Sequence, residues 1–128
     1  MRGTVKFFDK SKGWGFITNS EDKDVFLHYS NINIPKFKTL HENDIVEFEI
    51  GEGKEGKEQA VNVIPILTHR MIRESLKEEG LYVKNIKDIY GVKKYITVDV
   101  NNVIQSGEQG MLFLELAAYT GFDVEGLE

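Results

Sequence analysis

Two short aromatic segments constrain the fold of this chain more than any other feature. They are KGWGFIT, residues 12–18, and DVFLHYS, residues 24–30. Because successive side chains of a strand point to opposite faces, each segment divides into an aromatic face and an aliphatic face. The aromatic face carries Lys12, Trp14, Phe16, Phe26 and His28. The aliphatic face carries Ile17, Val25 and Leu27. The pattern predicts two adjacent strands with chemically different sides.

The aromatic face has the composition of a surface that binds nucleic acid. Unpaired bases stack on aromatic rings, and nearby cations meet the phosphates. Aromatic residues of strands usually belong to the core, and this is the alternative interpretation. The aliphatic face already supplies a core, however, and a thin sheet in a small domain cannot bury both faces. We therefore expect these rings at the surface.

The segment from Met1 to about Pro65 resembles a cold-shock domain. The resemblance rests on four stretches in family order and at family spacing: MRGTVKFFDKSKGWGFIT, DVFLHYSNI, FKTL and ENDIVEFEIGEGKEGKEQAVNV. The two aromatic segments match the ribonucleoprotein motifs of that family. The resemblance implies a five-stranded OB-type antiparallel barrel that binds single-stranded DNA and RNA with little sequence preference. It also implies a role as an RNA chaperone or a regulator of expression.

The resemblance also implies the residues of the binding site. Those that would stack on bases are Phe7, Phe8, Trp14, Phe16, Phe26, His28, Tyr29 and Phe37. Those that would lie beside the phosphate backbone are Lys6, Lys12 and Lys38, and Asp24 belongs to the same pattern. The family usually has Trp, Asn and Phe where this chain has Phe7, Asp9 and Trp14. The exchanged rings keep a stacking surface, whereas a carboxylate at Asp9 would repel phosphate and lower the affinity.

The other strands of residues 1–65 follow from alternation of apolar and polar residues over 46–50 and 61–63. Pro65 is expected to end the last strand, because proline removes a backbone donor. The predicted core consists of Val5, Ile17, Val25, Leu27, Ile32, Val46, Phe48 and Val61. Between the last two strands lies a glycine-rich hairpin loop, Gly51–Glu58. The loop matches GxGxxG and most of a P-loop, but no helix follows it, so nucleotide binding is disfavoured.

The charge of the chain argues against binding to a duplex. Residues 1–65 hold nine Lys or Arg and eleven Asp or Glu, a net charge of −2, and residues 66–128 hold seven and ten, a net charge of −3. Duplex binders derive much of their affinity from neutralised phosphates, whereas a stacked base contributes about 1–3 kcal/mol by itself. Most acidic residues of the first half fall within Glu42–Glu58, which we place away from the aromatic face. We therefore expect single-strand binding with a shallow salt dependence.

Composition disfavours several other classes of protein. The chain has no cysteine, and its three histidines, His28, His41 and His69, are far apart, so neither a disulfide nor a metal site is expected. No stretch approaches the ~20 apolar residues of a membrane span, and the first residues form no apolar signal segment. We expect a cytoplasmic protein with no membrane partner, no cofactor and no metal ion.

Residues 66–128 carry no family motif, and their pattern predicts a small α+β unit in the order α-β-β-α. The first helix begins after Thr68 as its N-cap and stops at Gly80. A β-hairpin is expected over 81–100, and a helix over 83–90 is the alternative for its first strand.

The second helix of this unit is expected over 110–120, with Gly121 as its C-terminal cap. Its apolar residues are Leu112, Leu116 and Tyr119 on one stripe, with Phe113 and Ala117 beside them. Two short strands cannot cover that much apolar surface. The barrel of residues 1–65 is one candidate to cover this surface, and a second copy of the chain is the other; a homodimer formed through the C-terminal half is favoured.

Three functions of different classes remain as hypotheses. The favoured one is a non-enzymatic protein in which domain 1–65 binds single-stranded RNA or DNA while domain 66–128 dimerises the chain or recruits a partner. The second is a metal-dependent nuclease in the C-terminal half, for which the available carboxylates are Asp88, Asp99 and Glu115. The third is an interaction scaffold that does not bind nucleic acid, and the displayed aromatic residues argue against it.

Overall fold

The computed structural model describes residues 1–35 and 38–127. The chain divides into two compact units, Met1–His69 and Arg70–Glu128. Phe37, one of the residues expected to stack on bases, lies outside the described residues.

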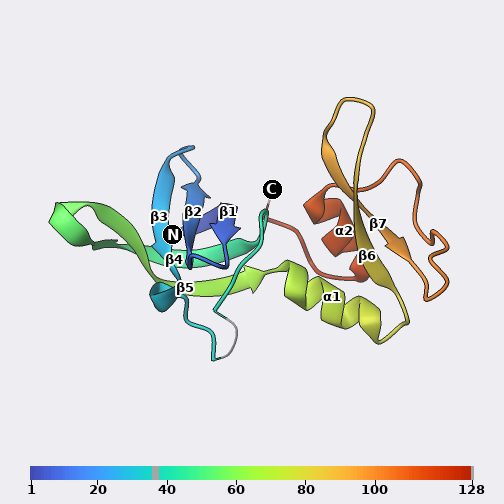
Figure 1. Ribbon diagram of the computed structural model, residues 1–128, viewed down its shortest axis with the longest axis horizontal. Helices are drawn as coiled ribbons and strands as arrows, with labels where there is room; N and C mark the ends of the chain where they lie inside the picture. Colours follow the sequence, from blue (N-terminus) through green and yellow to red (C-terminus); the bar gives the residue numbers. More distant parts are fainter. Residues whose placement is uncertain (36–37, 128) are drawn as a thin grey trace. The chain divides into compact units, whose positions relative to one another are not determined.

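The N-terminal unit is a closed five-stranded barrel with the strand order β1-β2-β3-β5-β4, as expected from the sequence (Figure 1). Its strands are β1 (Arg2–Asp9), β2 (Trp14–Asn19), β3 (Asp24–His28), β4 (Ile45–Glu52) and β5 (Glu58–Leu67). Neighbouring strands are antiparallel except at the closure, where β3 and β5 pair in parallel through Phe26 and Gln59. The resemblance implied an antiparallel barrel, and this one pairing departs from it.

The core of the barrel lies on the aliphatic side of the strands. Seven of the eight predicted core residues are buried: Val5, Ile17, Val25, Leu27, Ile32, Val46 and Phe48. The eighth, Val61, was predicted wrongly, because it is only half-buried while Ala60 and Val63 are fully buried. The register of β5 against β4 shifts here, and Asn62 has a φ of 51°, so the simple alternation of inward and outward residues is interrupted.

The prediction that Pro65 ends the last strand is wrong, since β5 continues to Leu67. Pro65 lies opposite Val46 and Leu67 lies opposite Ile45, with a register shift between the two pairs. At such a bulge proline need not donate a ladder hydrogen bond, so the strand can run through it.

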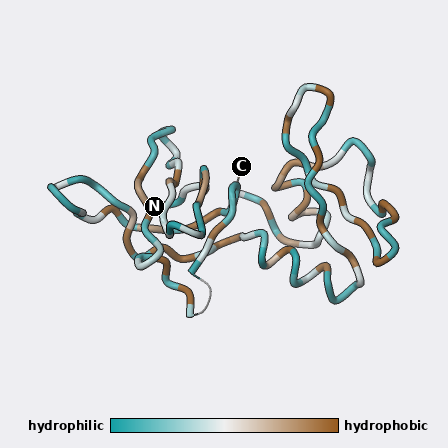
Figure 2. The backbone as a smooth tube through the Cα atoms, in the orientation of Figure 1, coloured by the Kyte–Doolittle hydropathy of each residue, from teal (hydrophilic) through white to brown (hydrophobic). Residues whose placement is uncertain are grey.

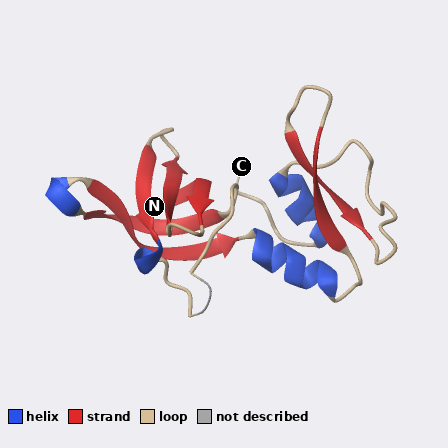
Figure 3. Cartoon of the chain, viewed as in Figure 1, coloured by secondary structure: helices blue, strands red, loops and turns tan. Residues whose placement is uncertain are grey.

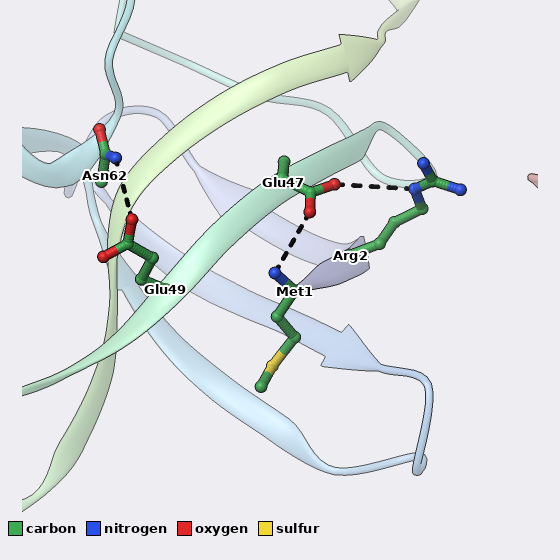
Figure 4. A network of polar contacts seen from close by, with 5 residues as sticks. All are labelled: Met1, Arg2, Glu47, Glu49 and Asn62. Carbon is green, nitrogen blue, oxygen red and sulfur yellow. Dashed lines mark hydrogen bonds and ion pairs between the residues drawn. The ribbon is translucent and has the colours of Figure 1, made fainter.

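Polar contacts tie β4 to both of its neighbours (Figure 4). The Glu47 carboxylate lies 3.2 Å from the Met1 amine and 3.8 Å from Nε of Arg2. The Asn62 side-chain amide donates to the Glu49 carboxylate at 3.4 Å. Exposed ion pairs of this kind add little to stability, typically 0–1 kcal/mol. They do show that acidic side chains of β4 have partners on the barrel itself.

The C-terminal unit has the predicted α-β-β-α order (Figure 3). Its elements are α1 (His69–Lys77), β6 (Tyr82–Lys87), β7 (Lys93–Val98) and α2 (Phe113–Thr120). The β6–β7 hairpin is confirmed and the alternative helix over 83–90 is wrong. A glycine with positive φ follows each helix: Gly121 at 108° is the C-cap of α2, and Gly80 at 74° closes the turn that follows Lys77, the last residue of α1. Among the described residues, no helix has the length and apolar character needed to cross a bilayer.

The buried face of α2 differs from the predicted stripe. Phe113, Leu116 and Ala117 are buried, and the rings of Phe113 and Tyr95 lie 6.4 Å apart, so this face covers β7. Leu112 and Tyr119 are each about half exposed. Leu112 is the N-cap residue with extended backbone angles, so it does not continue the helical stripe.

Candidate nucleic-acid interface

Four aromatic rings from three neighbouring strands form one surface, which we call the ring cluster: Phe7, Trp14, Phe16 and Phe26. Phe16 lies directly opposite Phe7 on β1 and Phe26 on β3. The ring centroids of contacting pairs are 5.6 to 6.2 Å apart, mostly in edge-to-face or tilted arrangements. Such spacing is that of mutually packed aromatic rings. The rings therefore support one another in fixed orientations.

The ring cluster is open to solvent. Phe7 is 39% exposed, and Trp14, Phe16 and Phe26 are half-buried. Phe48, an aromatic residue of the barrel core, is 1% exposed. The buried core includes none of the four rings of the ring cluster, which is left as a surface with accessible ring edges and faces.

A bulge in β1 determines which phenylalanine joins the cluster. The register of β1 against β2 shifts between Val5 and Phe7, so Lys6 and Phe7 are both exposed on the outer side. Phe8 is only partly buried but packs against the hydrophobic core. The structure therefore brings Phe7 into the ring cluster and does not bring Phe8 there.

His28 and Tyr29 extend the aromatic surface beyond the ring cluster. His28 lies opposite Trp14, and its ring centroid is 4.6 Å from that of Tyr29. The Ser30 N–H donates to Nδ1 of His28 at 3.3 Å, and the Ser30 hydroxyl lies 2.7 Å from the same nitrogen. Tyr29 is held near Gly13, where a Cβ would come 2.6 Å from the tyrosine ring. Glycine is needed there both for this approach and for its φ of 78°.

Lys6 is held at the edge of this surface by a carboxylate. Its Nζ donates to Asp24 at 2.8 Å, and the Thr18 hydroxyl donates to the other oxygen of Asp24 at 3.0 Å. The hydrogen bond from Lys6, followed by that from Thr18, lowers the pKa of Asp24 below its ordinary value of 3.8. Asp24 therefore acts as a positioning residue that fixes where the Lys6 ammonium lies.

Asp9, expected to repel phosphate, orders the turn between β1 and β2. Its Oδ1 accepts the Ser11 hydroxyl at 2.7 Å and the N–H groups of Ser11 and Lys12 at 3.0 Å each. The Ser11 hydroxyl is the largest cause of the lowered pKa of Asp9. Lys12 is exposed at the end of this turn, and Lys38 is exposed in the segment before β4.

A groove of about 880 Å³ runs beside the ring cluster. From β2 and β3 it is lined by Phe16, Phe26 and His28. From the β4–β5 loop and the start of β5 it is lined by Gly53, Lys54, Lys57, Glu58 and Gln59. The expectation that Glu42–Glu58 lies away from the aromatic face is therefore wrong for the end of that segment. The parallel pairing of β3 with β5 causes this, because it brings Gln59 directly beside Phe26.

Lys54, Lys57 and Gln59 are candidate site residues that the sequence did not identify. The two lysines were visible in GEGKEGKE, but the only signal for their placement is the barrel closure, which joins residues more than 30 positions apart. Cationic and amide side chains that line the same groove as aromatic rings can bind a polyanion whose planar groups stack on the rings.

The three carboxylates considered for a nuclease have structural roles. Asp88 and Asp99 each accept two backbone N–H groups of a tight turn, and Glu115 accepts the N–H of Leu112 at the start of α2. Within residues 1–35 and 38–127, no three His, Cys, Asp or Glu side chains are grouped to hold a metal ion. This arrangement offers no support for metal-dependent cleavage.

Known proteins match the N-terminal part of the chain. The family model described as the 'Cold-shock' DNA-binding domain matches residues 1–66. A cold shock-like protein of Thermotoga maritima is 58% identical over 60 residues, which are 47% of this chain and 91% of that protein. Cold shock protein CspA of Staphylococcus aureus is 48% identical over 65 residues, or 51% of this chain and 97% of that protein. A solved chain described as "drosophila Unr CSD456" matches at 22% identity with a TM-score of 0.40, covering 51% of this chain and 26% of its own.

Proposed function

The chain belongs to the 'cold-shock' DNA-binding domain family, and from this premise we propose that its barrel binds single-stranded RNA or DNA by stacking unpaired bases on the ring cluster. One observation carries the proposal. The barrel has its own buried hydrophobic core, yet it leaves Phe7, Trp14, Phe16 and Phe26 open to solvent on one face.

The residues that line the groove differ in chemistry, so they can bind different parts of a nucleic acid. Bases stack on Phe16 and Phe26, and each stacked base contributes about 1–3 kcal/mol. The ring of His28 and the side-chain amide of Gln59 line the same groove and can contact base edges or phosphate oxygens.

Lysine side chains at the edges of this surface bind the phosphates of the strand. Lys54 and Lys57 line the same groove as the rings, and Lys6 lies beside Asp24 at the barrel edge. Lys12 and Lys38 are exposed and complete the proposed set. Stacking and phosphate contacts do not distinguish one base from another, so little sequence preference is expected.

The same geometry disfavours double-stranded nucleic acid. In a duplex the base faces are already stacked on one another, so the ring cluster has nothing to engage. Residues 1–65 carry a net charge of −2, which is not the basic footprint from which duplex binders gain affinity. Binding should therefore need unpaired bases.

We further propose that the protein acts without catalysis, as an RNA chaperone or a regulator of expression. A single strand whose bases lie on the ring cluster cannot pair with another strand, so binding opposes secondary structure. In this proposal residues 1–65 form the nucleic-acid-binding domain, and residues 66–128 dimerise the chain or recruit a partner.

Fluorescence of Trp14 tests the proposal, since Trp14 is the single indole of the chain and belongs to the ring cluster. The full chain is titrated with a short oligothymidylate strand and separately with a duplex of equal length. Saturable quenching by the single strand and a much weaker response to the duplex are expected. Equal responses to both, or no response to either, would contradict it.

A further inference from the structure

The tip of the β6–β7 hairpin displays two large apolar residues to solvent. This loop, Asp88–Val92, extends beyond the two strands in Figure 1, and part of its tip is coloured as hydrophobic in Figure 2. Ile89 is 91% exposed and Tyr90 is 84% exposed, the highest values among the described large hydrophobic residues. Both residues lie in the C-terminal unit, which contributes no residue to the binding surface proposed on the barrel.

The geometry of the turn does not require these side chains, because the chain builds the same turn twice more. In Asn19–Lys23, Asp88–Val92 and Asp99–Val103, the first residue's Oδ1 accepts the N–H groups of the third and fifth residues. In each turn the fourth residue has a positive φ, between 59° and 78°. The turn in the barrel places Ser20 and Glu21 where the hairpin tip has Ile89 and Tyr90.

The tip is held in a defined conformation. Asp88 accepts the N–H of Tyr90 at 2.8 Å and that of Val92 at 2.9 Å, and Nζ of Lys94 lies 3.5 Å from its other oxygen. The N–H of Val92 is the largest cause of the lowered pKa of Asp88, so the carboxylate stays ionised at neutral pH. A partner that binds Tyr90 therefore meets a backbone that is already ordered.

The hairpin is also basic within an acidic chain. Residues 84–94 contain four lysines and one aspartate, a net charge of +3, whereas the whole chain carries −5. Lys87 is exposed, lies next to the turn, and faces Lys93 directly across the two strands. The one carboxylate of the segment is engaged by the turn. An exposed aromatic ring beside clustered lysines can bind a polyanion that carries planar groups.

We propose that the hairpin tip is a second contact for single-stranded nucleic acid, in which Tyr90 stacks on an unpaired base and Lys87 meets a phosphate. The proposal rests on the proposed function of the barrel, because the strand bound by the ring cluster is the one that reaches the tip. Tethering raises the effective concentration of that strand at the tip, so a weak contact adds measurable affinity. The tip therefore strengthens binding of strands long enough to contact it and the ring cluster at once, and leaves binding of shorter strands unchanged.

The test compares two oligothymidylates, of 7 and 30 nucleotides, binding to the full chain. The variant Ile89→Ser/Tyr90→Asn takes its residues from the equivalent positions Ser20 and Asn101, so the turn is retained. Its affinity for the 30-mer should fall about fivefold or more, which corresponds to one lost stack. Its affinity for the 7-mer should equal that of the wild type. The control Val100→Ser removes an exposed apolar residue at the matching position of the Asp99–Val103 turn and should change neither affinity.

A second measurement places the single indole at the tip, in the double variant Trp14→Phe/Tyr90→Trp. Its fluorescence should be quenched by the 30-mer and should not respond to vesicles rich in phosphatidylserine. Wild-type affinity of the loop variant for the 30-mer, or an equal loss for both lengths, would overturn the proposal. So would a tip indole that responds only to vesicles, which would assign the tip to an anionic membrane. If the barrel does not bind single strands, the 7-mer leaves Trp14 of the wild-type chain unquenched. This result distinguishes failure of the proposed function from failure of the proposal for the hairpin tip.

Discussion

At the scale of single residues, short carboxylates and amides order the turns that carry the exposed side chains. Asp9 fixes the turn before Lys12, Asp24 fixes Lys6, and Asp88 fixes the hairpin tip. The sequence identified Asp24 by its place in a family pattern and treated Asp9 as a source of repulsion. The turn that Asp9 orders was not foreseen, because hydrogen bonds to backbone N–H groups within a turn depend on φ and ψ, which residue identity alone does not reveal.

The pKa of Asp24 is a prediction at this scale. A carboxyl whose pKa is lowered in the folded state stabilises the fold above its unfolded pKa, and that contribution is lost as pH falls through the folded pKa. Carboxyl 13C shifts in an NMR titration should give Asp24 a midpoint below 3.8. In Lys6→Met the midpoint should rise, because the largest cause of the shift is removed. Unchanged midpoints in the two proteins would show that Lys6 is not bonded to Asp24 in solution.

At the scale of elements, alternation within a strand was predictable and pairing between distant strands was not. The faces of β2 and β3 followed from period two, and seven of eight core residues were assigned correctly. The bulge near Lys6, the interruption at Asn62 and the parallel closure of β3 with β5 were missed. Each depends on which residue of a remote strand lies opposite, so a local pattern contains no signal for it.

The β4–β5 loop gives the prediction for this scale. Because Lys54 and Lys57 line the same groove as the rings, removing both should weaken binding of a single strand and flatten its salt dependence. Each phosphate contact contributes about 0.7 to the slope of log K against log salt for single strands. For the double variant Lys54→Ala/Lys57→Ala, the slope of log K against log salt should therefore be smaller in magnitude than that of the wild type by about 1.4.

The matched control for the loop is Lys77→Ala, an exposed lysine in the last turn of α1. It also changes the net charge but lies outside the groove, so its slope should stay near that of the wild type. Equal slopes for the wild type and the loop variant would remove Lys54 and Lys57 from the interface.

At the scale of the whole molecule, the two units were predictable to different degrees. The barrel carried motifs dense enough to fix its fold, while the C-terminal half gave only an order of helices and strands. That order is confirmed, and Phe113, Leu116 and Ala117 of the predicted apolar surface of α2 are buried, but Leu112 and Tyr119 are about half exposed. The sequence does not show that Leu112 lies outside the helix as its N-cap. Self-association through this half stays a prediction.

Sedimentation velocity tests that prediction on the full chain. The expected result is a species of twice the 14.6 kDa mass of one chain. Leu112 is about half exposed on the C-terminal unit, so Leu112→Glu should shift the population toward monomer, whereas Val100→Glu should not. A single 14.6 kDa species at all concentrations of the wild type would contradict the dimer.

The two faces of β3 provide an internal control for the central claim. Val25 and Phe26 are neighbours in sequence, but Val25 is buried and Phe26 faces the groove. Val25→Ala should lower the free energy of unfolding by about 1–3 kcal/mol, as expected for loss of buried methyl groups with a residual cavity. Phe26→Ala should have a smaller effect on unfolding by urea. Tyr82→Ala, which removes an exposed ring from the C-terminal unit, controls for nonspecific loss of aromatic surface.

The most direct test of stacking on the ring cluster is the affinity of Phe16→Ala and Phe26→Ala for a 7-nucleotide oligothymidylate, measured by fluorescence anisotropy of a labelled strand. Each variant should lose about 1–3 kcal/mol of binding free energy, which is roughly a 5- to 150-fold weaker Kd, while the Tyr82→Ala control binds as the wild type does. Wild-type affinity in both folded variants would contradict the assignment of this face as the binding surface.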